Sequence, residues 1–474
     1  MIAFTPFPAP TGKATRLAQR ISALSSAGYS LDVLTPKAST LPHVSKLARA
    51  RILRVPMPAE RESAVGAVRG RAGTPPATPR LTDLYAAFER AVRRQMESEE
   101  YDGVLVMDPS AASAVLGSRQ GAKLLYEPGG DLPTRDDPVL TEELERRDLM
   151  LLESADAVFV PSEQAEEDAR SRGATARRVH LLRPAVDLAL FGTGAAARRR
   201  GASTLRVAVA AGQLRAEEIS LLAEAVLILP ASCELRVVVS AAVTDEERRA
   251  IQLAGPALSR LELREPMLYD DLVPFYDESD LGLVVSAGAL RDKIPPARLQ
   301  AVAELMAAGL APVLPDLAAV REMVDHDVEA LLVAPGDVEA LVNALQAVAQ
   351  NEPLRRRLGL AARKRAAAMH DERSAGELLV RICGRVMSRR QGTWGETVQG
   401  DDAEPRNDGI KSLLRTAWSA PDDRQGNASV PVTVAQRSPS RPNPSIASPR
   451  DDSTSVDGPA PPETARLAAT RKQQ

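Results

Sequence analysis

A single carboxylate stands out in the stretch 301–316, which reads AVAELMAAGLAPVLPD. Glu304 lies in an otherwise apolar helical run that ends at Gly309, and an apolar strand-like segment follows and stops at Pro315. A carboxylate suits a ligand with two adjacent hydroxyls, because its two oxygens accept a hydrogen bond from each. A glutamate that caps a helix or forms a salt bridge is the structural alternative, and the residues alone leave both open.

Further candidates lie near the carboxyl ends of two expected strands in the first half of the chain. Gly12 closes a Pro-rich loop, lets the backbone approach a ligand, and precedes a helix whose free N–H groups suit an anion or a sugar hydroxyl. Lys13 could contact a phosphate, although a solvated lysine is the favoured explanation. Asp108 follows a strand at 102–107 and could act as a base or orient an acceptor, although such aspartates commonly cap the next helix.

The elements that would position these residues follow an α/β pattern. Short β-type runs alternate with helical patterns over about the first 390 residues, which predicts parallel sheets with crossover helices. The periodicity stops in 192–203, GTGAAARRRGAS, and we place the domain boundary there. We therefore expect two Rossmann-like, doubly wound domains, 1–191 and 204–388, the second including the final helix, that face a cleft in which a ligand binds.

Composition narrows the class of protein. The chain of 474 residues carries a formal net charge of -3, so nothing global points to nucleic acid, and its two cysteines match no metal or disulfide pattern. No apolar run reaches the roughly 20 residues that span a bilayer, and the start shows no signal-peptide layout, so we expect a cytoplasmic protein. The segment 389–474 is rich in Pro, Ser and Asp, and we expect it to be disordered.

Several segments together resemble the GT-B glycosyltransferases, especially the retaining family 4. They include SADAVFVPS, similar to the family's A-D-x-V-x-x-x-S, and ELMAAGLAPVL, similar to its E-A-M-A-x-G-x-P-V-V. The other similar segments are 4–36, 183–191, 212–226, 280–286 and 329–359. The resemblance covers about residues 1–388. It implies the GT-B fold, with an N-terminal acceptor domain and a C-terminal domain that binds a nucleotide-sugar.

The resemblance also implies roles for individual residues. Glu304 matches the glutamate that binds the ribose hydroxyls of the donor. We carry over a donor-binding set that also includes neighbours able to substitute for missing family residues. The set is Glu304, Gly212, Gln213, Arg215, Lys293 and Gly309. Gly12 and Lys13 would form the acceptor or phosphate loop, and Asp108 is the candidate catalytic residue.

The sequence departs from the family at three positions. The family has a second glutamate eight residues before the first, where this chain has Pro296. The family's arginine and lysine that offset the charge of the leaving diphosphate are replaced by Gln213 and Glu218, and a glutamate that faces a diphosphate would repel it. Arg298, like Arg215 or Lys293, could supply the missing charge, although a solvated arginine or lysine explains each one singly.

The leading hypothesis is a metal-independent glycosyltransferase, without a cofactor, that moves a sugar from a nucleotide-sugar to an unidentified acceptor, whether a glycan, a lipid or a small molecule. The alternative is an inactive pseudo-glycosyltransferase that serves as a partner or regulatory subunit, which the three departures favour. A GT-B epimerase is a third interpretation without specific support. Peripheral membrane association stays open, because the segment 44–55 is both basic and apolar.

Overall fold

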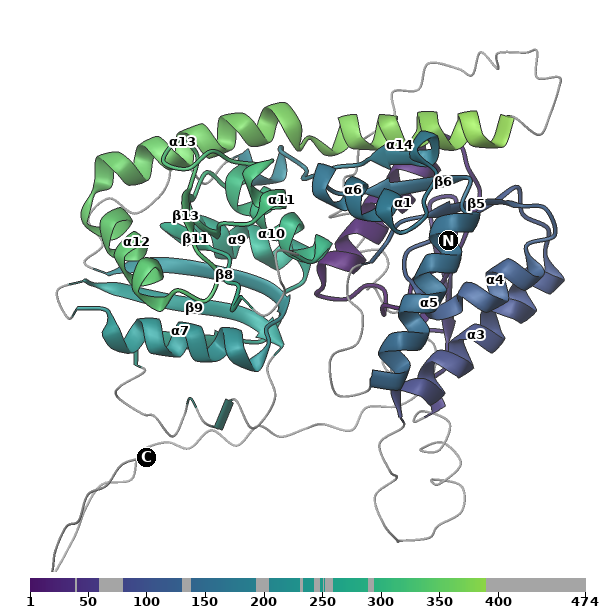
Figure 1. Ribbon diagram of the computed structural model, residues 1–474, viewed down its shortest axis with the longest axis horizontal. Helices are drawn as coiled ribbons and strands as arrows, with labels where there is room; N and C mark the ends of the chain where they lie inside the picture. The colour runs from purple at the N-terminus through teal and green to yellow at the C-terminus, as the bar shows by residue number, and fades with distance from the viewer. Residues whose placement is uncertain are drawn as a thin grey trace, which may run out of the picture. The chain divides into compact units, whose positions relative to one another are not determined.

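The computed structural model describes residues 1–388 apart from 39–40, 59–79, 130–137, 193–203, 231–232, 243–247, 250, 252–258 and 289–293. The tail expected at 389–474 therefore lies outside the described residues, as do Lys293 and nearly all of the expected linker 192–203. Within residues 1–388 the chain forms two β-sheets with helices packed against them (Figure 1).

The first sheet is built from the N-terminal half of the chain. Its strands are β1 (Leu31–Pro36), β2 (Val44–Leu47), β3 (Ala50–Val55), β4 (Gly103–Val106), β5 (Lys123–Tyr126), β6 (Ala157–Val160) and β7 (Val179–Leu181). Ile2 bridges β1 to β4, so that the order runs β2, β3, β1, Ile2, β4, β5, β6, β7. All neighbours pair in parallel except β2, which pairs antiparallel with β3 at the edge. The basic segment 44–55 is therefore a pair of strands.

The helices of this half are α1 (Gly12–Ser26), α3 (Leu81–Ser98), α4 (Ala112–Ser118), α5 (Pro138–Ser154) and α6 (Glu163–Ser171), with short 3-10 turns at Pro109–Ala111, Ala176–Arg178 and Leu190–Gly192. Helix α3 is amphipathic: it buries Phe88, Val92 and Met96, which are spaced four residues apart and therefore lie on one face. Helix α1 is buried over most of its length, including its polar residues, which places it at the centre of the structure rather than on its surface.

The second sheet has six parallel strands. They are β8 (Leu205–Gln213), β9 (Leu235–Ala242), β10 (Leu261–Arg264), β11 (Leu281–Leu283), β12 (Ala311–Pro315) and β13 (Leu331–Val333), in the order β10, β9, β8, β11, β12, β13. The helices are α7 (Ala216–Ile228), α9 (Tyr269–Asp277), α10 (Pro296–Ala307), α11 (Ala318–Arg321), α12 (Val338–Gln350), α13 (Glu352–Met369) and α14 (Glu372–Ser388). This 3-2-1-4-5-6 order is the doubly wound arrangement, and the expected α/β fold is confirmed.

The last two helices connect the two sheets. Helix α13 packs on α10, and α14 returns to the first sheet and packs on α1 (Figure 1). Gly376 in α14 allows this approach, because a Cβ there would lie 3.1 Å from the Cβ of Ala23. Where the chain turns from α13 into α14 it runs beside the segment that leaves the first sheet, with Val186 bridged to Asp371.

Candidate functional site

The second sheet has a switch point between β8 and β11, where the strand order reverses. Ligands of open α/β sheets bind outside the carboxyl ends of the strands at such a point. Helix α7 begins just after β8, and α10 begins after the loop that follows β11, so the first turns of both helices lie at this edge. The sequence positions that depart from the family fall in these two turns and at the end of β8.

Glu218, which we expected to repel a diphosphate, is fully buried and paired with two arginines. Its carboxylate accepts hydrogen bonds from the backbone N–H of Arg215 at 3.0 Å and from Nη2 of Arg298 at 2.6 Å. The Arg215 guanidinium lies 3.4 Å from its other oxygen. The first contact is one half of a capping box, which stabilises the first turn of α7. Glu218 therefore lies between two positive groups, and the cluster carries a net positive charge.

Pro296, at the position of the family's earlier glutamate, is the first residue of α10. Proline is favoured there because it has no N–H to leave unpaired and its φ angle suits a helix start. The place of Pro296 at the start of α10 thus explains why a proline suits this position. Asp292, the nearest acidic residue before Pro296 in the sequence, lies outside the described residues.

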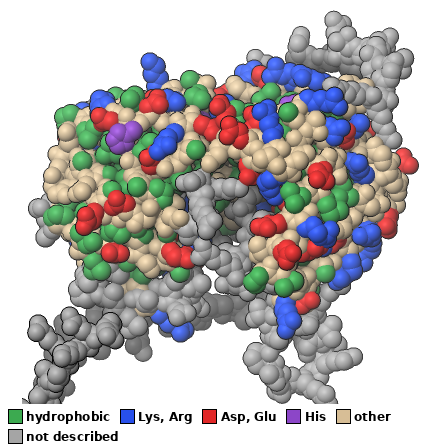
Figure 2. Space-filling model, in the orientation of Figure 1, with side chains coloured by type: hydrophobic (Ala, Val, Ile, Leu, Met, Phe, Trp, Pro, Cys, Tyr) green, Lys and Arg blue, Asp and Glu red, His purple; other side chains and the backbone are tan. Residues whose placement is uncertain are grey.

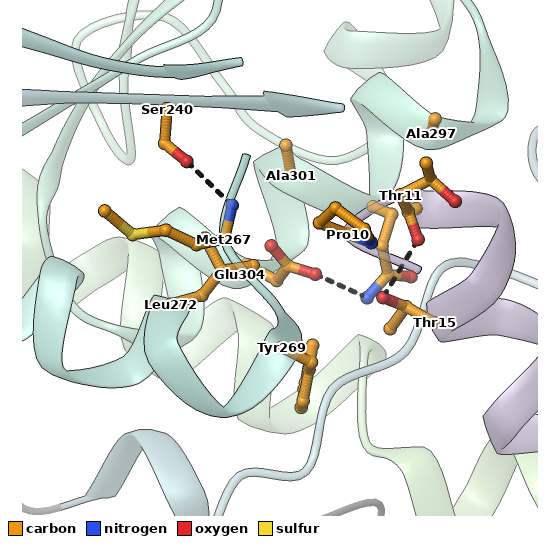
Figure 3. A pocket seen from close by; sticks show the side chains of 12 residues that line it. Pro10, Thr11, Thr15, Ser240, Met267, Tyr269, Leu272, Ala297, Ala301 and Glu304 are labelled. Carbon is orange, nitrogen blue, oxygen red and sulfur yellow. Dashed lines mark hydrogen bonds between the residues drawn. The ribbon is translucent and has the colours of Figure 1, made fainter. Parts of the chain in front are cut away.

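Glu304 lines a small cavity between the two sheets. The cavity measures about 40 Å³, and α10 contributes one face of it through residues spaced three or four apart. Its lining residues are Pro10, Thr11, Gly12, Thr15, Ser240, Met267, Tyr269, Leu272, Ala297, Gln300, Ala301 and Glu304. In Figure 3 the Glu304 carboxylate lies among these side chains, with Ser240 and Met267 on one side and Thr11 and Thr15 on the other.

Neighbouring groups hold the Glu304 carboxylate in place. Its oxygens accept hydrogen bonds from the Tyr276 hydroxyl at 3.0 Å and from Nε2 of Gln300 at 3.2 Å. The side chain is only 4% exposed, and burial raises its pKa to about 7 even though both hydrogen bonds act to lower it. Near neutral pH the group is therefore divided between its carboxylate and its protonated form, and a ligand that donates hydrogen bonds would favour the carboxylate.

The same glutamine ties the cavity to the segment that joins the two sheets. The backbone carbonyl of Ala185 accepts hydrogen bonds from Nε2 of Gln300, at 2.8 Å, and from Nε2 of Gln19 in α1, at 2.6 Å. His370, in the returning segment, makes a 2.8 Å hydrogen bond to the Pro184 carbonyl, and burial lowers its pKa to about 4. Neither glutamine was expected from the sequence. Only the spacing of Gln300 four residues before Glu304 could have indicated one of them.

The first sheet has its own switch point, between Ile2 and β4, and Lys13 and Asp108 meet there. The Lys13 Nζ lies 3.8 Å from the Asp108 carboxylate, and both side chains are nearly buried. Asp108 also accepts hydrogen bonds from the backbone N–H groups of Phe4, at 2.5 Å, and Ser110, at 3.1 Å, and from the Ser110 hydroxyl. The Asp108 carboxylate thus links the loop at Phe4 to the turn after β4, and it caps that turn. Capping is the structural alternative that was left open for Asp108.

A second buried carboxylate in this region was not anticipated. Glu127 follows β5 and binds Nε of Arg16 at 3.1 Å and Nε of Arg20 at 2.9 Å, both from α1. Burial acts to raise the pKa of Glu127, but the charges of Arg20 and Arg16 and their hydrogen bonds hold it below its usual value. The two arginines of α1 are therefore paired with a buried carboxylate, which explains how a helix that carries them lies at the centre of the structure.

The remaining candidates are placed as follows. Gly12 begins α1, and a Cβ there would lie 3.0 Å from both Cα and Cβ of Ala297, so only glycine lets α1 and α10 approach this closely. Gly212 and Gln213 end β8 next to an irregularity in its pairing with β9. Gly309 follows α10 with a φ of 65°, a left-handed conformation that commonly ends helices.

Two further properties concern only the described residues. Within them, no three His, Cys, Asp or Glu side chains are grouped so that they could bind a metal ion. No helix in the same part of the chain is long and apolar enough to cross a membrane.

On the face shown in Figure 2 basic and acidic side chains are intermingled, in keeping with the small net charge. Metal independence and the absence of nucleic acid stay predictions.

Comparison with known proteins identifies the family. Residues 11–185 match the model of the glycosyl transferase 4-like domain, and residues 206–351 match that of the glycosyl transferases group 1. The two matches together cover more than half of the chain. Among curated proteins, none matches the sequence.

Three solved structures illustrate the similarity of fold. Sucrose-phosphate synthase from Thermosynechococcus elongatus is 19% identical with a TM-score of 0.65, covering 82% of this chain and 98% of that one. WaaG, a glycosyltransferase involved in lipopolysaccharide biosynthesis, is 13% identical with a TM-score of 0.59, covering 83% and 99%. HepE from Anabaena, solved in complex with UDP-glucose, is 14% identical with a TM-score of 0.57, covering 81% and 98%. The chain therefore belongs to the family 4 glycosyltransferases of GT-B fold, which transfer a sugar from a nucleotide-sugar donor.

Proposed function

We propose that this protein is an active, metal-independent glycosyltransferase whose donor nucleotide binds in the cavity at Glu304. The observation that carries the proposal is the Glu304 carboxylate itself. It is buried and aimed into a cavity between the two sheets, where Tyr276 and Gln300 hold it. Burying a carboxylate is costly, and a ribose with two adjacent hydroxyls would offset that cost by donating to it. The glutamate also matches the family motif.

The reaction would follow the usual balance of glycosyl transfer. An acceptor hydroxyl oxygen forms a bond to the anomeric carbon of the sugar, and the bond from that carbon to the diphosphate breaks. The electron pair stays on the diphosphate, and the hydroxyl proton passes to the departing diphosphate. The acceptor would bind on the side of α1, whose first turn, with Gly12, borders the cavity. We keep the cytoplasm as the proposed location.

Binding must enlarge the cavity. Sites for small-molecule ligands measure roughly 300–1,000 Å³, whereas this cavity measures about 40 Å³. The first turns of α1 and α10 are in contact at Gly12 and Ala297, so these turns must separate to admit a nucleotide-sugar. We therefore propose that the described arrangement is a closed one and that donor entry requires the two sheets to move apart.

A second candidate function is a pseudo-glycosyltransferase that acts as a partner or regulatory subunit. The observation that favours it is Pro296, which offers neither charge nor N–H where the family has a glutamate for the donor sugar. The proposed enzyme and this alternative differ in turnover rather than in fold.

Calorimetry of the full chain against UDP-, GDP- and ADP-sugars tests the proposal, with Glu304→Ala as the matched variant. We expect micromolar binding of one donor that Glu304→Ala loses, and slow release of free sugar from that donor as evidence of catalysis. Binding without any release or transfer would support the pseudo-enzyme. The donor site proposed here would be wrong if binding were the same in the variant, or if no donor bound the wild-type protein.

A further inference from the structure

Arg298 is a partly buried cation in α10, the helix that lines one face of the cavity of Glu304. It follows Ala297, which lines that cavity, and its side chain is only 12% exposed. Its Nη1 donates to the Val285 carbonyl at 2.9 Å, just after β11, and its Nη2 donates to Glu218 at 2.6 Å. The two contacts fix the plane of the guanidinium at the switch point of the second sheet.

The ion pair with Glu218 joins the two sides of this switch point. Glu218 belongs to α7, which follows β8, and Arg298 belongs to α10, which follows β11. Glu218 is in turn anchored by the Arg215 backbone N–H at 3.0 Å, so its carboxylate is a rigid support. A long arginine side chain loses considerable rotamer freedom when it is ordered. Here the two hydrogen bonds to Val285 and Glu218 already order the side chain.

The backbone of α10 offers little to an anion at this point. Pro296 has no N–H, and the N–H groups of Arg298 and Leu299 both donate to the Pro295 carbonyl, at 2.9 and 3.3 Å. A helix start normally binds anions through such N–H groups. Three of the first four residues of α10 therefore lack an N–H group or use it at the helix start. Side chains are thus the main source of positive charge at this edge, and Arg298 is held there by two hydrogen bonds.

We propose that Arg298 binds the diphosphate of the nucleotide-sugar and that Glu218 is the positioning residue that holds its guanidinium for that contact. This inference rests on the proposed function, because it takes Glu304 as the nucleotide end of the same site. Glu218 then has a role in binding, because its carboxylate orients the cation that contacts the diphosphate. As the bond to the sugar breaks, Arg298 offsets the charge that grows on the diphosphate.

The test compares a nucleoside diphosphate with its nucleoside. Calorimetry of the full chain with UDP and uridine, and with the GDP and ADP pairs, measures what the phosphates add to affinity. We expect Arg298→Gln to weaken binding of the diphosphate by about tenfold or more, the effect of one charge-assisted hydrogen bond. Nucleoside binding should stay within about twofold. Arg298→Lys should restore part of the loss by restoring the charge.

Two further variants separate positioning from structure. Glu218→Gln keeps an acceptor for the Arg215 N–H but loses the charge that orients Arg298, so diphosphate affinity should fall while nucleoside affinity holds. Arg206→Gln removes a matched arginine that pairs with Glu278 at 2.7 Å, at the start of β8 and away from the switch point, and should change neither.

The outcomes distinguish this inference from the proposed function. Equal losses for diphosphate and nucleoside in Arg298→Gln would show that Arg298 only supports the fold and would overturn the inference. Unchanged diphosphate binding in Arg298→Gln would overturn it too, while leaving the donor site at Glu304 in place. If the wild-type protein bound no nucleotide or nucleoside at all, both proposals would fall together.

Discussion

Replacing Glu304 with glutamine should make the protein more stable and less able to bind its donor. Burial raises the pKa of Glu304 from 4.5 to about 7, so the folded protein holds a proton on this group that the unfolded chain releases. Stability therefore falls as pH rises from the unfolded pKa to the folded one, and the penalty is complete above about pH 7. A pKa shift of about 2.5 units corresponds to a loss of about 3 kcal/mol in the free energy of unfolding. About 2 kcal/mol of this loss develops between about pH 5.5 and pH 8.

Glutamine keeps the shape of the side chain and its contacts with Tyr276 and Gln300 but carries no charge. We expect the free energy of unfolding of Glu304→Gln to exceed that of the wild type by about 3 kcal/mol at pH 8 and by about 1 kcal/mol at pH 5.5. Urea unfolding followed by circular dichroism at both pH values measures this. The variant must be compared with the wild type at each pH because burial also raises the pKa of Glu372, to about 8. Glu372 therefore makes the free energy of unfolding of both proteins fall as pH rises.

The reasoning fails if the difference between variant and wild type does not change with pH, because the carboxylate would then not be buried as described. Donor binding supplies the second readout. The variant should bind a nucleotide-sugar more weakly at every pH, since an amide has one acceptor oxygen where the carboxylate has two. Greater stability together with unchanged binding would refute the role of Glu304 in the donor site.

Three other predictions follow from the packing and from the expected chemistry. Gly12→Ala places a Cβ 3.0 Å from Ala297 and should lower the free energy of unfolding, measured with urea, by about 1 kcal/mol. The reason is that overpacking outweighs the stabilisation that alanine gives by restricting the unfolded chain. Higher stability would contradict the close contact. Asp108→Asn turns an amide nitrogen toward the N–H of Phe4 or Ser110 and should cost about 2 kcal/mol in the same assay, whereas an unchanged value would argue against the buried cap. Transfer activity, once a donor is found, should survive an excess of EDTA, and its loss there would show that a divalent metal takes part.

The architecture was predictable from the sequence because it depends on local periodicity. Buried parallel strands are short apolar runs, as in β12, where all five residues are buried, and helices show the wider spacing of α3. Both patterns are local properties of the chain. The antiparallel edge strand β2 was not anticipated, since pairing direction is decided by a partner strand rather than by the strand itself.

The site was only partly predictable. Glu304 was found because it lies in a motif within one helix, and the structure places it in a cavity. Glu218 was expected to face a diphosphate as a repulsive charge, yet its partner Arg298 lies 80 residues further along the chain. Pro296 stood out as a missing glutamate until the structure showed it to be the first residue of α10.

The sequence by itself determined that this chain forms two doubly wound α/β units and carries one carboxylate of the right type at the right motif position. Only the tertiary structure decided which charges are neutralised, and by what. Lys13 meets Asp108 at one switch point and Arg298 meets Glu218 at the other, and in each pair the two residues belong to segments that follow different strands. Sequence spacing cannot reveal such pairs, because parallel strands bring together the ends of segments that are far apart in the chain.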